Sequence, residues 1–198
     1  MPTDIAESDR TRLIELLRKE SSNAVPDAVL DEFIGLGQVV ELPAQAPLVA
    51  EGDVNTNVYA LIEGVLRSWH WDGEVEHTDY FGMAGTLCVC YHCYLWHHVS
   101  PNTIEACCPS RLLRVSKKDF DQLLRSNNDF AWWVIGNLQC QNYYYEMKHN
   151  VIKGTARERY EALVKNRPEL LRNVPLKVIA SYLGITPAYL SRLRAKIK

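Results

Sequence analysis

The C-terminal stretch at residues 175–198 reads PLKVIASYLGITPAYLSRLRAKIK and predicts two short helices joined by a tight turn. Two helices that cross closely need a small residue at the crossing, here Ala180, and a turn residue that tolerates positive φ, here Gly184. Thr186 is a suitable N-cap for the second helix, and Pro187 fits its first position. The apolar residues expected to fill the angle between the helices are Ile179, Leu183, Ile185, Leu190 and Leu193. The pattern predicts a helix-turn-helix.

The outer face of the second helix, residues 187–197, suits the major groove of double-stranded DNA. Arg192 can donate two hydrogen bonds to a guanine, and Ala188 or Tyr189 can contact a thymine methyl or a neighbouring base edge. Contacts to phosphates set the register of a protein on DNA rather than the sequence that it reads. The residues expected to make them are Lys177, Ser181, Thr186, Ser191 and Arg194. The alternative is a helical hairpin that only packs, with its arginines in solvent.

The charge of the chain supports two modules with different partners. The net charge is −2, but residues 153–198 carry 11 Lys and Arg against three Glu, a balance of +8. The first 152 residues therefore have a balance of −10. A basic block suits a polyanion, because Lys and Arg that neutralise phosphates supply most non-specific affinity for nucleic acids. A solvated basic helix surface is the alternative.

The rest of the composition is that of a globular chain with a packed core. Its 198 residues are 47% hydrophobic, which allows one large or two small domains. No apolar run approaches the roughly 20 residues that cross a bilayer, and the N-terminus lacks the pattern of a signal peptide. We expect a cytoplasmic protein with no membrane partner. The six cysteines are then expected to be reduced thiols.

The middle of the chain predicts an antiparallel β-sandwich or barrel. Residues 9–20 and the stretch from Pro26 have the spacing of amphipathic helices, and residues 39–115 then form short apolar runs split by turn residues. Residues 58–62 and 65–71 predict two strands joined tightly at Glu63-Gly64. The dipeptide Asp72-Gly73 predicts a further hairpin. Ser116 to Asp119 have capping-box spacing and predict the return of helix.

A long helix is predicted from about Asn128 to Asn150, with a seam suited to a second copy of the chain. The seam residues are Phe130, Val134, Leu138, Gln141 and Tyr145, in steps of four and three residues. The alternative is a helix packed on its own sandwich. Gly154 interrupts the pattern, and Thr155 to Glu158 form a second capping box. The predicted domains are therefore 1–127, a dimerisation helix and hinge at 128–153, and 154–198.

These features together resemble the Crp/Fnr family of transcription regulators. Glu51-Gly52-Asp53 resembles a turn of the family's cyclic-nucleotide-binding β-roll, and residues 58–67 resemble the hairpin that follows it. Residues 157–163 and 175–194 resemble the DNA-binding domain of a short branch, without a β-wing after the recognition helix. The resemblance implies an α+β fold: a jelly-roll-like β-roll, a long dimerisation helix and a helical DNA-binding domain. It further implies a homodimeric regulator, not an enzyme, that reads a palindromic site, with RNA polymerase as an expected partner.

The β-roll departs from the family where cyclic nucleotides bind. Members that bind them carry a phosphate cassette with a glycine-glutamate pair, an arginine and a small residue. The corresponding stretch here has no Lys or Arg between Arg67 and Arg111. A buried anionic phosphate without a cation is poorly compensated. We therefore expect no response to cyclic AMP and assign no cofactor or metal.

A group of cysteines and histidines at residues 70–108 leaves the effector open. Cys and His are ligands of zinc, iron–sulfur clusters and haem, but the spacing Cys88-x-Cys90-x-x-Cys93 is not that of an established finger. Sensing of a metal, haem or redox state, an unknown small-molecule effector, and no effector remain alternatives. Two rival functions also remain: a cupin-like metal-binding protein or enzyme that uses residues 70–108, and a sensing module that acts by protein contact.

Overall fold

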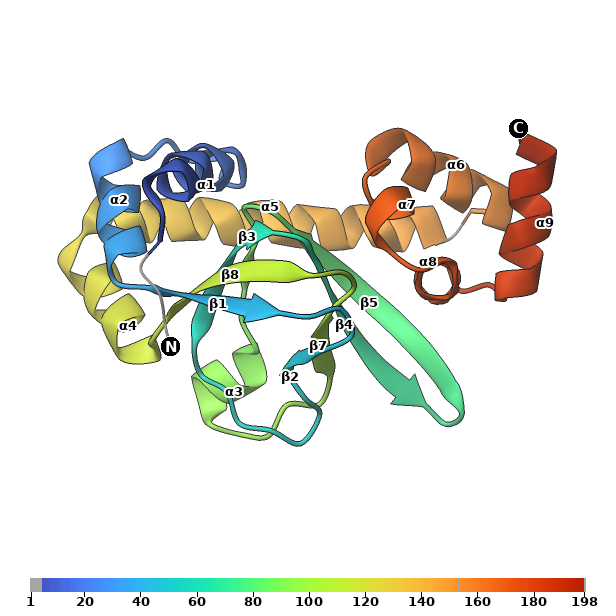
Figure 1. The fold of residues 1–198 in the computed structure, drawn as a ribbon, viewed down its shortest axis with the longest axis horizontal. Helices are drawn as coiled ribbons and strands as arrows, with labels where there is room; N and C mark the ends of the chain where they lie inside the picture. Colours follow the sequence, from blue (N-terminus) through green and yellow to red (C-terminus); the bar gives the residue numbers. More distant parts are fainter. Residues whose placement is uncertain (1–4, 153, 198) are drawn as a thin grey trace.

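The computed structural model describes residues 5–152 and 154–197, without the side chains of 148–152 and 197. A β-roll lies beside one long helix, and a group of short helices lies at the far end of that helix (Figure 1). The chain begins with α1 (Glu7–Lys19) and α2 (Asp27–Gly35), as predicted. Among the described residues, no helix is long and apolar enough to cross a membrane.

The β-roll consists of two four-stranded antiparallel sheets, in the orders β1-β8-β3-β6 and β2-β7-β4-β5, so the predicted sandwich is confirmed. The strands are β1 (Gln38–Leu42), β2 (Pro47–Val49), β3 (Val58–Glu63), β4 (Val65–Asp72), β5 (Val75–Met83), β6 (Leu87–Cys88), β7 (Thr103–Ala106) and β8 (Ser110–Val115). A short helix, α3 (Tyr91–Trp96), lies between β6 and β7.

The tight turn at Gly64 connects the two sheets rather than closing a hairpin. Gly64 has φ +102°, and a Cβ there would lie 2.1 Å from Ser110 Oγ. The strands before and after it, β3 and β4, belong to different sheets, so the hairpin expected at this position is wrong. Apolar runs beside a turn predict two strands but do not show whether those strands pair. The hairpin at Asp72-Gly73 is confirmed, since Asp72 pairs with Val75.

The N-terminal core extends into the long helix. α4 (Lys117–Ser126) begins after Ser116, whose hydroxyl accepts from the amide of Asp119 as predicted, and α5 spans Asn128–Ile152. Phe130 and Trp133 of α5 are fully buried against Phe33 of α2, with ring centroids 5.3 and 6.2 Å from that of Phe33. The start of α5 is therefore held in a fixed position on the β-roll unit.

The C-terminal unit contains α6 (Ala156–Asn166), α7 (Leu170–Asn173), α8 (Leu176–Tyr182) and α9 (Pro187–Ile197). The predicted capping box of Thr155 and Glu158 is present at the start of α6. The predicted boundary at residue 153 lies outside the described residues, so the division into domains stays a prediction. Most of the apolar core of this unit is its own, including Tyr160, Leu163, Leu170, Val178, Ile179 and Leu190.

Candidate DNA interface

The helix-turn-helix has the geometry that its sequence predicts. Ala180 is fully buried, Gly184 turns the chain with φ +64°, and the Thr186 hydroxyl accepts a hydrogen bond from the amide of Tyr189 at 3.2 Å. Leu190 and Leu193 are buried, so one face of α9 packs inward. This packing fixes α9 relative to the rest of the helix-turn-helix, so the opposite face of α9 points outward.

Seven of the eight residues predicted to contact DNA are exposed to solvent. They are Lys177, Thr186, Ala188, Tyr189, Ser191, Arg192 and Arg194. The Arg192 guanidinium lies 5.9 Å from the centroid of the Tyr189 ring, so the two side chains share one patch. α9 lies at the outer end of the molecule, away from the β-roll (Figure 1). The exposed face of α9 is therefore accessible to a large partner.

Ser181, the eighth residue, is bonded to the β-roll instead of being free for a phosphate. Its hydroxyl donates to the carbonyl of Glu76 at 2.7 Å and accepts from the amide of Thr78 at 2.9 Å. Both partners belong to β5, the edge strand of its sheet. In this arrangement of the two units the Ser181 hydroxyl is occupied by β5, and its contact with a phosphate stays a prediction. Helical spacing places Ser181 on the outer face of α8 but does not reveal a neighbouring unit.

The contact between α8 and β5 continues through aromatic side chains. The rings of Tyr182 and Phe81 lie 4.8 Å apart between centroids, and Phe81 is buried. This contact cannot be predicted from the sequence, because nothing in the spacing of Phe81 or Tyr182 distinguishes a contact within one unit from a contact between two. The structure thus holds the helix-turn-helix unit docked on the β-roll.

The predicted dimer seam of α5 faces its own chain over most of its length. Phe130 and Val134 are buried in the N-terminal core. Gln141 donates to the carbonyl of Leu87 at 3.1 Å, and Tyr145, half exposed, stacks on Tyr80 with 5.6 Å between centroids. Phe130 and Val134 are therefore wrong as interface residues, since an apolar stripe marks a covered face without showing what covers it. The alternative, a helix packed on its own sandwich, is confirmed for this face.

Another face of α5 remains uncovered and carries large apolar side chains. Trp132, Ile135 and Tyr143 are 55, 41 and 56% exposed, and Leu138 of the predicted seam is 40% exposed at its edge. Trp132, Ile135 and Tyr143 share one face of the helix with the polar Gln139, because these four positions recur in steps of three and four residues. Apolar groups gathered on one helix face favour a partner surface.

Arg67 and Arg111 are the cations on either side of the stretch that corresponds to the family's phosphate cassette, and both are already paired. Arg67 is buried and forms salt bridges with Glu76 at 2.6 Å and Glu105 at 2.7 Å. Arg111 pairs with Asp9 at 2.7 Å. All the guanidinium nitrogens of Arg67 are bonded to Glu76, Thr78 or Glu105, and Arg111 is held by Asp9, so neither arginine is directed at a cyclic phosphate.

Four of the six cysteines, Cys88, Cys90, Cys93 and Cys107, are buried side chains of the core. Burial raises the pKa of the Cys88 and Cys107 thiols to about 12, which keeps both protonated at neutral pH. Cys90 is also buried and donates to the Ser100 hydroxyl at 3.3 Å. Within residues 5–152 and 154–197, no three His, Cys, Asp or Glu side chains converge as metal ligands do. The rival metal site at residues 70–108 gains no support from this geometry.

Comparison with known proteins agrees with the two-unit architecture. The family model of the cyclic nucleotide-binding domain matches residues 39–127, so this segment belongs to that domain family. A search of curated proteins by sequence gives no significant match. The family match covers the β-roll and reaches the end of α4.

Solved structures of bacterial regulators have the fold of the whole chain. CLP of Xanthomonas campestris, described as a c-di-GMP-responsive global regulator, is 12% identical, with a TM-score of 0.71 over 87% of this chain and 91% of its own. A CooA variant of Carboxydothermus hydrogenoformans is 17% identical, with a TM-score of 0.67 over 99% and 85%. FixK2 of Bradyrhizobium japonicum, at 17%, has a TM-score of 0.60 over 81% and 84%. The chain thus has the fold of these regulators, in agreement with the resemblance to the Crp/Fnr family that its sequence indicates.

Proposed function

We propose that this protein is a DNA-binding transcription regulator, not an enzyme, that acts in the cytoplasm. The observation that carries the proposal is the helix-turn-helix whose second helix, α9, presents an exposed basic face. An exposed face on a helix fixed by a buried inner face is what entry into a major groove requires. The balance of +8 in residues 153–198 supplies the attraction to phosphates.

The roles of the side chains follow from their positions on the helix-turn-helix. Arg192 is the proposed reader of a guanine, and Ala188 and Tyr189 supply contacts to neighbouring base edges. The proposed phosphate contacts are Lys177, Thr186, Ser191 and Arg194, all exposed. Ser181 is left out of this set because it bonds to β5.

The proposed active form is a homodimer paired through the uncovered face of α5. Trp132, Ile135 and Tyr143 supply its apolar surface, and Leu138 lies at the edge. A two-fold axis along this helix would place two copies of α9 on one side of the dimer. They would enter successive major grooves about 34 Å apart on a palindromic site. RNA polymerase is the expected partner on the DNA.

We expect no response to cyclic AMP or cyclic GMP. The chain has no Lys or Arg between Arg67 and Arg111, and both of these arginines are paired with carboxylates. A cyclic phosphate in the β-roll would then be buried without a cation of its own. Any effector of this protein therefore has to bind by other chemistry.

The test is retention of the purified protein on duplex DNA as a function of salt. A mixture of random duplexes is selected for binding, and the selected sequences are tested individually. We expect enrichment of a palindromic site and an affinity that falls steeply with salt. A protein that is not retained on any duplex at low salt contradicts the proposal and favours a sensing module that acts by protein contact.

A further inference from the structure

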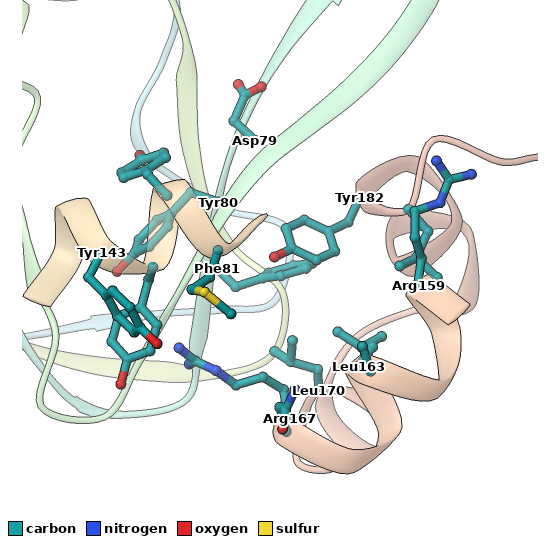
Figure 2. Close-up of a pocket in the computed structure, with 15 residues that line it drawn as sticks. Asp79, Tyr80, Phe81, Tyr143, Arg159, Leu163, Arg167, Leu170 and Tyr182 are labelled. Carbon is teal, nitrogen blue, oxygen red and sulfur yellow. The ribbon is translucent and has the colours of Figure 1, made fainter. Parts of the chain in front are cut away.

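A cavity of about 390 Å³ lies between the β-roll and the DNA-binding unit. Its walls come from β5, the C-terminal half of α5, α6, α7 and α8, so both units contribute to it (Figure 2). This volume is within the range of small-molecule pockets, which occur preferentially between domains. The cavity lies outside the stretch that corresponds to the family's phosphate cassette. None of the residues proposed to contact DNA lines it.

The cavity is lined by aromatic rings. Tyr80 and Phe81 come from β5, Tyr143, Tyr144 and Tyr145 from α5, and Tyr182 from α8. Burial raises the pKa of Tyr80, Tyr145 and Tyr182, so these phenols are neutral. Neutral aromatic walls favour a planar aromatic ligand, because rings gain by stacking beyond the area that they bury.

Arg167 supplies a cation to these walls. Its side chain extends from the end of α6 toward the tyrosines of α5 (Figure 2). The guanidinium lies 4.9 Å from the centroid of the Tyr144 ring and donates to the thioether sulfur of Met83 at 3.7 Å. Thioether sulfur is a weak acceptor, and none of the described carboxylates forms a salt bridge with Arg167. Glu20 is close enough for Arg167 to oppose the rise that burial causes in the pKa of Glu20, but the two side chains form no salt bridge. The N–H groups of Arg167 can therefore receive an anion.

The charge of the cavity selects a monoanion. Two arginines, Arg159 and Arg167, and one carboxylate, Asp79, are the charged side chains in its wall, which gives a formal charge of +1. The planar fork of a guanidinium matches the two oxygens of a carboxylate. A phosphate monoester carries nearly two charges at neutral pH and fits this balance less well.

We propose that the cavity binds a planar aromatic carboxylate, with its ring among the tyrosines and its carboxylate on Arg167. The ligand bridges β5 and α6, so it stabilises the docked position of the DNA-binding unit and lowers affinity for DNA. This regulatory effect rests on the proposed function, whereas the binding itself does not. Ligand and DNA then oppose each other by linkage.

The test is calorimetric titration of the full chain with naphthalene-2-carboxylate and indole-3-acetate. We expect at least one of them to bind to the wild type. Its affinity for Arg167→Gln should be about 10-fold lower, because a charged hydrogen bond is lost. Arg172→Gln, an exposed arginine of α7 outside the cavity, is the matched control and should bind as the wild type does. Naphthalene-2-carboxamide, which lacks the charge, should bind as weakly as the Arg167→Gln protein binds the acid.

A second variant keeps the test valid if Arg167→Gln does not fold. Ala162→Phe places a ring into the cavity from α6 and should abolish binding while Arg167 is retained. Adenosine 5′-monophosphate separates a nucleotide from a carboxylate. Failure of both acids to bind at millimolar concentration, equal binding by Arg167→Gln, or preference for the nucleotide overturns the proposal. Because binding is measured without DNA, these outcomes leave the proposed function untouched.

Discussion

Arg192 is the side chain on which the proposed base readout depends. It is exposed on α9 beside Tyr189, and a bidentate contact to a guanine is worth about 1–3 kcal/mol of discrimination. We expect Arg192→Ala to cost that much on the selected site and to relax preference at one base pair. Lys177→Ala, at a proposed phosphate contact, should weaken binding to all duplexes alike. Equal losses on every sequence from both variants would show that Arg192 reads no base.

Single residues were predictable where one local requirement decided them. Gly184, Thr186 and Ala180 each satisfy a rule of the turn, the cap or the crossing, and each lies where the sequence places it. Ser181 was not predictable, because its partners lie in β5, about a hundred residues earlier in the chain. The aromatic cavity is unpredictable for the same reason, since five separate elements line it.

At the scale of elements, the crossing from β3 to β4 depends on Gly64. An alanine there would require φ +102° and would place its Cβ 2.8 Å from the Cα of Ser110. We expect Gly64→Ala to lower the free energy of unfolding by about 3 kcal/mol, from backbone strain and overpacking combined. Urea unfolding provides the measurement.

The matched control for this variant is Gly52→Ala. Gly52 also has positive φ, +87°, but no atom lies within 4 Å of an added Cβ. Only the conformational cost of about 1–2 kcal/mol applies there. If the two variants lose the same stability, the close approach to Ser110 has no energetic weight.

The uncovered face of α5 is the proposed dimer interface. Ile135→Glu should make the protein monomeric at micromolar concentration, because two carboxylates would face each other in a desolvated contact. Each chain should still fold, since Ile135 lies outside the buried core. Sedimentation of wild type and variant gives the answer, with Val54→Glu, an exposed loop position, as control. A wild-type monomer, or a variant that remains dimeric, places the interface elsewhere.

The elements themselves were largely predictable, while their partners were not. The helices α1 and α2 and the Asp72-Gly73 hairpin follow from periodicity and turn chemistry, which act over a few residues, whereas α3 lies in a stretch predicted to form strands. The side of α5 that covers the β-roll and the crossing at Gly64 depend on contacts between distant segments. The spacing of Phe130, Val134 and Gln141 predicts that this face of α5 is covered, but it does not show which surface covers it.

At the scale of the whole molecule, the docked position of the DNA-binding unit bears on its activity. The first helix of a helix-turn-helix crosses the DNA backbone. In this structure that helix, α8, lies against β5, and the hydroxyl of Ser181 forms two hydrogen bonds with it. If the proposed DNA binding holds, DNA and β5 compete for α8, and we infer that the docked arrangement has the lower affinity for DNA.

Replacement of Ser181 separates this role from the phosphate contact that its sequence position suggests. Ser181→Ala removes both hydrogen bonds, each worth about 0.5–1.5 kcal/mol, and so shifts the population toward undocked molecules. Affinity for the selected duplex should then rise roughly 5-fold, as measured by fluorescence anisotropy. The control is Ser191→Ala on the exposed face of α9, which should leave affinity unchanged or lower it. A fall in affinity for Ser181→Ala would mean that its hydroxyl contacts a phosphate and that docking on β5 does not restrain the DNA-binding unit.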